Sequence, residues 1–216
     1  MSIQSKVNKL KEDLKNKAVT LIAVTKYASI EQMLEAYSLG IRDFGESKVQ
    51  VFEDKIKDIP EAIFKEIRWH FIGHLQTNKI KKVVGNFDII HSVDTPKLLE
   101  AISKESRKKN ITQKVLLEVN ISKEESKYGF TKEEILKQFS ELAKLSNIDI
   151  IGLMTMAPYT EDKAIKQKVF KELRELKEQL SNNYTLTELS MGMSEDYLVA
   201  VEEGSTMVRI GKMLFA

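Results

Sequence analysis

The chain has 216 residues, with 34 Lys and Arg against 32 Asp and Glu, a net charge of +2, and 42% hydrophobic residues. This apolar fraction is too high, and the net charge too small, for a disordered chain, and the balanced charge excludes the broad basic surface of a dedicated nucleic-acid-binding protein. Cysteine is absent, which excludes disulfides, zinc–thiolate sites and thiol catalysis and fits the reducing cytoplasm, where we expect the protein to act.

The N-terminal stretch 1–17 is polar and amphipathic, so it predicts a first helix with Ile3, Val7, Leu10 and Leu14 on one face. It lacks the apolar core of a secretory signal, and no apolar run approaches the roughly 18 residues of a membrane span. We therefore expect a protein without a signal peptide or a membrane segment. At about 150 residues per domain, we expect one domain over residues 1–216.

The first half of the chain then alternates strand and helix patterns. The expected elements are a strand at 19–26, a helix closed by Gly40, a strand at 41–46, a helix at 48–57, a strand at 67–73, a short helix at 75–84 and a strand at 87–93. Ser29 and Gln32 form a capping box that opens the first of these helices. The strand segments are short, apolar and rich in β-branched residues, which is typical of strands buried on both faces.

The second half continues the alternation. The expected elements are a helix opened by Thr95 and Pro96, a strand at 114–121, a helix opened by the capping box of Thr131 and Glu134, a strand at 148–155, a long helix, a strand at 187–192, a short helix at 194–203 and a strand at 206–211. The apolar face of the long helix comprises Ile165, Val169, Leu173, Leu176 and Leu180.

Eight short strands that alternate with helices predict a parallel sheet, because parallel strands need a crossover that is usually helical. Eight units favour an α/β fold with a single closed (β/α)8 TIM barrel, here with an extra N-terminal helix. An open doubly wound sheet is the competing topology. It usually has fewer strands, and no G-x-G-x-x-G motif follows the first strand to support a dinucleotide site.

Lys26 follows the first strand, at the end of the barrel where active sites lie. We expect apolar walls around it, because it leaves a buried strand, and desolvation disfavours the charged ammonium. A neutral amine can attack a carbonyl and form a Schiff base. The alternative interpretation is an ordinary solvated lysine, which is the more common state of this residue type.

A second candidate site lies at the ends of the last two strands. The segment 189–194 contains Ser190 and Ser194, and the segment 204–212 contains Arg209, a charge inside an apolar strand that must find a partner. Loops after strands seven and eight of barrels commonly bind phosphate through backbone N–H groups at a helix N-terminus. Ser194 as a plain helix cap is the alternative. Together with Lys26, these features indicate a phosphorylated carbonyl ligand.

The three histidines are His70, His74 and His91. The spacing of His70 and His74 would suit a metal site on a helix, but both residues fall in a predicted strand and turn. We therefore interpret the histidines as core or ligand-contacting residues and expect no metal.

Several ordered motifs of the chain resemble one known family, the pyridoxal phosphate (PLP) homeostasis proteins, which are related to the barrel domain of alanine racemases. The resemblance runs from about Leu21 to the C-terminus. The motifs are AVTK (23–26), FGES with Gln50 (44–50), WHFIGHLQTNK (69–79), SVD (92–94), VNIS (119–122), SKYGF (126–130), GLMTM (152–156), LSMGMSEDY (189–197) and GSTMVRIG (204–211).

The resemblance implies that Lys26 carries PLP as a Schiff base. It implies that Arg209 faces the pyridine nitrogen, while Ser194 and the backbone near Gly211 hold the phosphate. An arginine there keeps its proton, so the cofactor is a weaker electron sink than one paired with a carboxylate. Family members commonly have Asn at the position of Ser47, which predicts modestly weaker binding here. The candidate cofactor-binding residues are Lys26, Ser47, Ser190, Ser194, Arg209 and Gly211.

Related racemases take a second acid/base from an additional β-rich domain, for which we expect no room after the eighth strand. Proton transfer on both faces of a substrate needs two groups, and only Lys26 is evident. We therefore expect a monomeric carrier in PLP homeostasis, without robust catalysis, that passes PLP to apo-enzymes. The alternatives are a slow PLP-dependent amino-acid racemase and a Schiff-base aldolase without cofactor.

Overall fold

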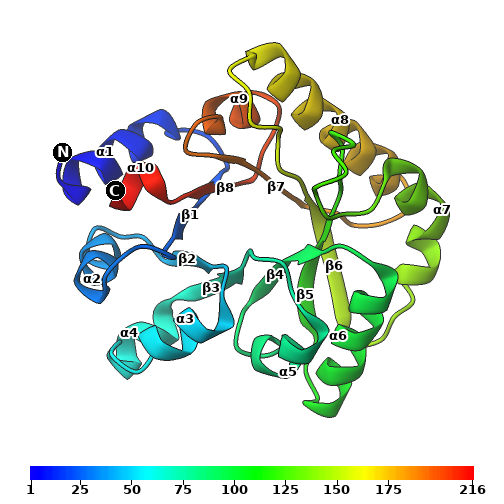
Figure 1. Cartoon of the computed structure of the whole chain (residues 1–216), viewed down its shortest axis with the longest axis horizontal. Coiled ribbons are helices and arrows are strands. Elements are labelled where there is room, and N and C mark those ends of the chain that lie inside the picture. Colours follow the sequence, from blue (N-terminus) through cyan, green and yellow to red (C-terminus); the bar gives the residue numbers. More distant parts are fainter.

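Eight parallel strands form a closed barrel in the computed structural model, which describes residues 1–216 (Figure 1). Each strand pairs with the next in the chain, and the last pairs with the first. The strands are β1 (Thr20–Val24), β2 (Asp43–Glu46), β3 (Arg68–Phe71), β4 (Ile89–Val93), β5 (Gln113–Glu118), β6 (Ile148–Met154), β7 (Glu188–Met193) and β8 (Met207–Ile210). The predicted (β/α)8 barrel with an extra N-terminal helix is confirmed.

The helices surround the barrel, as Figure 1 shows. They are α1 (Ile3–Asp13), α2 (Ile30–Ser38), α3 (Val49–Lys55), α4 (Glu61–Glu66), the 3-10 turn η1 (Thr77–Lys79), α5 (Ile80–Val83), α6 (Pro96–Lys108), α7 (Lys132–Leu142), α8 (Lys163–Ser181), α9 (Tyr197–Glu202) and α10 (Lys212–Phe215). None of them combines the length and the apolar character that a membrane crossing requires.

Local capping residues set several helix starts where the sequence predicts them. The Ser29 hydroxyl accepts a hydrogen bond from the Gln32 backbone N–H, and the Gln32 side chain accepts one from the Ser29 backbone, so α2 has a full capping box. Thr131 and Glu134 form the same reciprocal pair at α7. These caps satisfy backbone donors that the first helical turn leaves free.

Three local predictions are wrong, and the structure has two additional short helices. The expected helix at 75–84 is a 3-10 turn followed by the single turn of α5, and the helix after β7 begins at Tyr197 rather than at residue 194. Two short helices, α4 and α10, were not predicted. Ile165 is 44% exposed although the rest of its predicted stripe is buried, because it lies in the first turn of α8.

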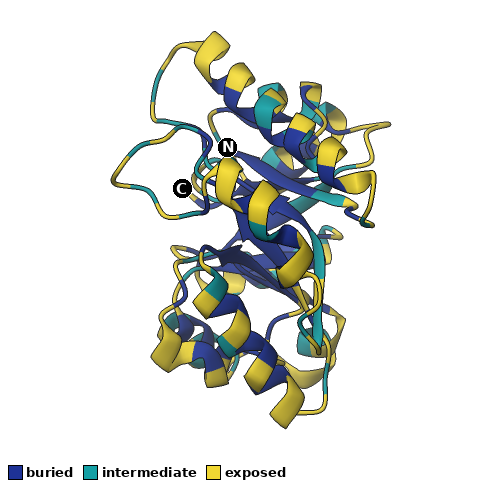
Figure 2. Cartoon of the chain, turned by 90° about the vertical axis from the view of Figure 1, so that its right-hand side faces the viewer, coloured by how far each residue is buried: buried dark blue, intermediate teal, exposed yellow.

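The core has two layers, outside and inside the barrel. The large outer cluster packs the outward side chains of the strands against the helices, whose opposite faces are exposed (Figure 2). Inside the barrel the apolar cluster is small and consists of Ile22, Ile89, Leu116, Met154 and Met207. Barrel interiors are usually filled by bulky apolar side chains. Here many inward positions are polar and buried, namely those of Asp43, His70, His91, Glu118, Ser190 and Arg209.

The two ends of the chain lie side by side in α1 and α10 (Figure 1). The Lys6 ammonium donates a hydrogen bond of 2.6 Å to the Ala216 carbonyl. The Tyr197 hydroxyl donates to the Asp13 carboxylate at 2.6 Å, which connects α1 to α9. The extra N-terminal helix therefore packs against α2 and α10 and is hydrogen-bonded to α9.

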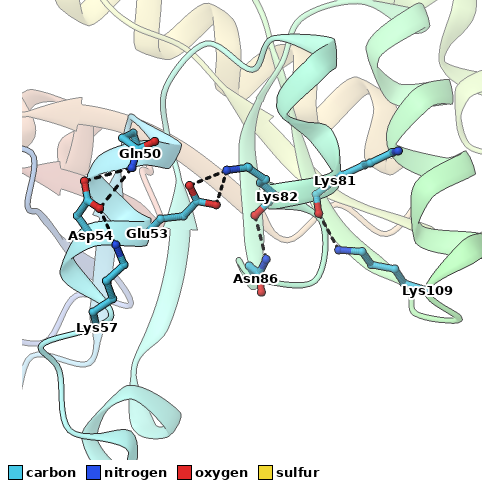
Figure 3. Close-up of polar contacts among 8 residues, drawn as sticks. All are labelled: Gln50, Glu53, Asp54, Lys57, Lys81, Lys82, Asn86 and Lys109. Atoms are coloured by element: carbon cyan, nitrogen blue, oxygen red, sulfur yellow. Dashed lines mark hydrogen bonds and ion pairs between the residues drawn. The ribbon is translucent and has the colours of Figure 1, made fainter.

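Exposed ion pairs lie between and along the outer helices. Lys82 of α5 reaches Glu53 of α3 at 2.7 Å, and Lys57 pairs with Asp54 at 2.9 Å (Figure 3). Both pairs face water, where such contacts contribute at most about 1 kcal/mol. They therefore add little to the stability of the barrel.

Candidate functional site

The structure brings the predicted site residues to four neighbouring strands of the ring. Arg209 in β8 pairs with Ile22 of β1 on one side and with Met193 of β7 on the other, and β2 follows β1. The strands are parallel, so the residues that follow them meet at one end of the barrel. The candidates on these strands or just after them are Lys26, Ser47, Ser190, Ser194, Arg209 and Gly211.

Lys26 lies at the mouth of the barrel but is exposed, so the expectation of apolar walls around it is wrong. Its Nζ lies 4.9 Å from the centre of the Tyr27 ring, which is itself 81% exposed. The reason is local: β1 ends at Val24, and the chain turns outward after Thr25. The amine is therefore open to a ligand that enters from solvent.

A buried carboxylate that the sequence did not single out holds the turn before Lys26. Glu46, the last residue of β2, accepts hydrogen bonds from the Thr25 hydroxyl at 3.1 Å and from the Ser47 backbone N–H at 2.8 Å. It also pairs with the Lys55 ammonium at 3.2 Å, and that ammonium donates to the Thr25 carbonyl. Glu46 therefore connects the exits of β1 and β2 to α3, through the residue that precedes Lys26.

Arg209 finds its partners inside the barrel, and they are neutral. Its guanidinium donates to the Ser190 hydroxyl at 2.6 Å and to the Thr155 carbonyl at 3.1 Å. Burial lowers the pKa of Arg209 to about 10, against the opposing attraction of Glu118. The group therefore stays charged at neutral pH and presents a fixed cation to the mouth.

Ser194 and Gly211 lie together beyond β7 and β8. The Ser194 hydroxyl accepts a hydrogen bond from the Met213 backbone N–H at 3.2 Å, so Ser194 joins the two exits rather than capping α9. Its own O–H proton stays free to donate. A Cβ on Gly211 would lie 3.1 Å from Val24, so the glycine lets this loop approach β1 closely. A hydroxyl donor and bare backbone therefore face the same opening.

Ser47 lies on the β2 exit, beside the exit of β1. Its backbone N–H is used by Glu46, whereas its hydroxyl has no partner within the chain. A Cβ on Gly73 would overlap the Ser47 carbonyl, so Gly73 allows the β3 exit to pack against it. The free hydroxyl is a short polar contact point at the rim.

The histidines divide between the core and the rim. His70 and His91 are buried inside the barrel and bond to each other at 2.9 Å. His74 lies at the mouth, where its Nδ1 is 3.0 Å from Asp94 and its ring stacks on Tyr128 with centroids 3.9 Å apart. His74, Asp94 and Tyr128 border a cavity of about 590 Å³. His74 and Asp94 follow the third and fourth predicted strands, which indicates that both lie at the mouth, whereas no pattern places Tyr128 beside them.

Glu118 ends β5 with its side chain buried at the same mouth, where burial and the neighbouring Asp94 raise its pKa to about 7, against Arg209. The folded state thus binds a proton that the unfolded state, with its ordinary value of 4.5, releases. Stability should fall as the pH rises from about 4.5 to 7. Between about pH 4.5 and 7, we expect the free energy of unfolding of the wild type to fall by about 2 kcal/mol relative to that of Glu118→Gln, as measured by urea denaturation.

Other titrating groups, such as His91 with its lowered pKa, are present in both proteins and cancel in this difference. A difference in unfolding free energy that stays constant with pH would contradict the raised pKa of Glu118.

The whole chain matches one family model. This model, described as the alanine racemase N-terminal domain, covers residues 1–216. A protein of Aquifex aeolicus named pyridoxal phosphate homeostasis protein is 42% identical over 197 residues, which are 90% of this chain and 85% of that protein. A Schizosaccharomyces pombe protein of the same name is 33% identical over 212 residues, which are 96% of this chain and 88% of that one.

Solved structures agree with this relationship. PipY of Synechococcus elongatus with PLP bound has a TM-score of 0.90 and 34% identity, and the alignment covers 100% of both chains. The alanine racemase of Clostridium difficile has a TM-score of 0.82 at 13% identity, over 99% of this chain and 56% of that one. The racemase supports the fold alone, whereas the relatives with higher identity identify the family.

Proposed function

This chain belongs to the pyridoxal phosphate homeostasis proteins, within the alanine racemase N-terminal domain family, and on this premise we propose that it binds PLP covalently through Lys26 and acts as a carrier in PLP homeostasis. In this proposal, residues 1–216 form a single cofactor-binding domain. The protein is a monomer that passes PLP to apo-enzymes and does not turn substrates over at an enzymatic rate.

One observation carries this proposal: the barrel mouth gathers the donor set that PLP requires. The cofactor has an aldehyde, an aromatic ring nitrogen and a phosphate. Lys26 offers an exposed amine, Arg209 a buried cation with neutral partners, and Ser194 with Gly211 a hydroxyl and bare backbone. These groups come from β1, β8 and β7, which are neighbours in the ring. The residues present therefore fit the group.

Each residue has a separate task. The Lys26 amine forms the covalent bond with PLP. The hydrogen bond from Thr25 to Glu46 holds the turn that places this amine. The Arg209 guanidinium faces the ring nitrogen as a donor that keeps its proton. When bound, PLP supplies a reactive aldehyde and an electron-accepting ring. Arg209 makes this ring a weaker electron acceptor, because it does not give its proton to the ring nitrogen. Ser47 offers a short hydroxyl where relatives commonly have Asn, so we expect slightly weaker binding.

The experiment is an absorbance spectrum of the protein after PLP addition, before and after borohydride reduction, with peptide mapping of the labelled residue. We expect a visible band that reduction removes and a stable adduct on Lys26. An adduct on another residue, or none with excess PLP, would contradict the proposal.

A slow racemase is the second candidate, and Glu118 favours it. A carboxyl with a pKa of about 7 at the mouth suits a group that both donates and accepts protons near neutral pH. Exchange of the α-proton of amino acids in deuterated water, followed by mass spectrometry, separates the two candidates. A carrier leaves the α-proton in place, whereas a racemase exchanges it.

A further inference from the structure

A continuous chain of hydrogen bonds crosses the inside of the barrel. It begins at Asp43, whose Oδ1 lies 2.9 Å from His70 Nε2, and continues from His70 Nδ1 to His91 Nε2 at 2.9 Å. From there His91 Nδ1 lies 2.8 Å from the Ser190 hydroxyl, which Arg209 contacts at 2.6 Å. All five residues are buried.

The two ends of this chain fix its direction. Arg209 can only donate, so the Ser190 oxygen accepts from it. The only other partner of this hydroxyl is His91 Nδ1, so the buried Ser190 O–H is satisfied by donating there. An ionised Asp43 can only accept, so His70 donates from Nε2 and accepts at Nδ1. His91 must then donate from Nε2. Every bond points the same way only if both imidazoles are neutral and carry their proton on Nε2.

The surroundings support these charge states. Burial would raise the pKa of Asp43, but hydrogen bonds from His70 and from Arg68, whose guanidinium lies 2.6 Å from Asp43 Oδ2, lower it overall. Burial, followed by the repulsion that a protonated His91 would meet from a protonated His70 and from Arg209, places the pKa of His91 well below its usual value, so the two rings are not both charged. Both ends of the hydrogen-bond chain are thus charged and His91 is neutral, and a single direction of the bonds requires His70 to be neutral as well.

We propose that Asp43, His70, His91 and Ser190 are positioning residues that hold Arg209 in one orientation by a directional chain of hydrogen bonds across the barrel. Ser190 accepts from Nη1 of the guanidinium, and the Thr155 carbonyl accepts from Nη2. The remaining N–H groups are then fixed toward the mouth. The consequence for PLP rests on the proposed function: a fixed donor at the ring nitrogen sets the absorbance and the affinity of the bound cofactor.

The first test needs no cofactor and no substitution. A long-range ¹H–¹⁵N correlation spectrum of the labelled protein at neutral pH reports the tautomer of each histidine. We expect His70 and His91 both to be neutral with the proton on Nε2. An imidazolium or an Nδ1-protonated ring at either position would overturn the proposal.

The second test reverses the chain from its far end. In Asp43→Asn, Arg68 donates to the amide oxygen, so the amide N–H₂ faces His70 and donates to it. His70 must then carry its proton on Nδ1, and His91 must follow. We expect both tautomers to switch. A switch at His70 alone, or at neither ring, would show that the residues are not coupled.

The same variant tests the effect on PLP from a residue at the opposite end of the barrel. We expect a shifted visible band and about threefold to tenfold weaker PLP binding. Asp88→Asn is the matched control: Asp88 accepts from the Trp69 backbone N–H and contacts no member of the chain. An unchanged band and affinity in Asp43→Asn would refute the positioning role. If the wild type takes up no PLP, the proposed function fails. The histidine tautomers still test the hydrogen-bond chain in that case, because their measurement needs no cofactor.

Discussion

Replacing Lys26 with Ala is expected to abolish the visible absorbance of the protein in the presence of PLP. The band depends on the bond between the cofactor aldehyde and an amine, and Lys26 is the exposed amine at the exit of β1. The variant should keep its fold, because an exposed side chain without buried contacts changes the free energy of unfolding by about 0.5 kcal/mol or less. Absorbance spectra and urea unfolding of the same sample measure both quantities.

Lys48→Ala is the matched control for this experiment. Lys48 is also exposed and follows β2 at the same end of the barrel, next to Ser47. We expect it to keep the visible band. A band that survives in Lys26→Ala but disappears in Lys48→Ala would show that Lys48, and not Lys26, forms the bond with PLP.

The sequence predicts the fold well because the barrel repeats one local pattern. Each short apolar strand is followed by a helix, and caps such as Ser29 with Gln32 mark helix starts through contacts within a few residues. The local failures occur where the surroundings decide. Ile165 continues the apolar stripe of α8 but lies in its first turn, where it is 44% exposed.

The site was harder to predict because barrel closure determines which residues meet. Lys26 and Arg209 are far apart in the sequence, and only the pairing of β1 with β8 brings their strands together. Asp43, His70 and His91 look like isolated polar residues in three apolar strands. These residues meet because their side chains all point into the barrel. The sequence alone does not give the register between neighbouring strands, so it does not show which inward side chains lie opposite each other.

Glu46→Ala is expected to lower the free energy of unfolding by about 3 kcal/mol, measured by urea denaturation. The substitution leaves the Lys55 ammonium without its carboxylate, in a site where the lysine side chain is 13% exposed and that of Glu46 1%. Removing one partner of a buried pair costs about 3–5 kcal/mol. We expect the lower value because the long Lys55 side chain can reach water. PLP binding should also weaken, since Thr25 loses the contact that places the Lys26 turn.

Glu53→Ala provides the matched control on the same helix. Glu53 pairs with Lys82 at 2.7 Å, but both side chains are substantially exposed (Figure 3), so its loss should cost less than about 1 kcal/mol. The double variant Glu46→Leu with Lys55→Leu removes both charges together and should recover part of the stability lost in Glu46→Ala, because no unpaired charge stays buried. Equal losses in Glu46→Ala and Glu53→Ala would mean that burial does not strengthen the Glu46 pair. Stability that recovers in the double variant without recovery of PLP binding would separate the two tasks of Glu46, since an apolar side chain restores packing but cannot accept the Thr25 hydrogen bond.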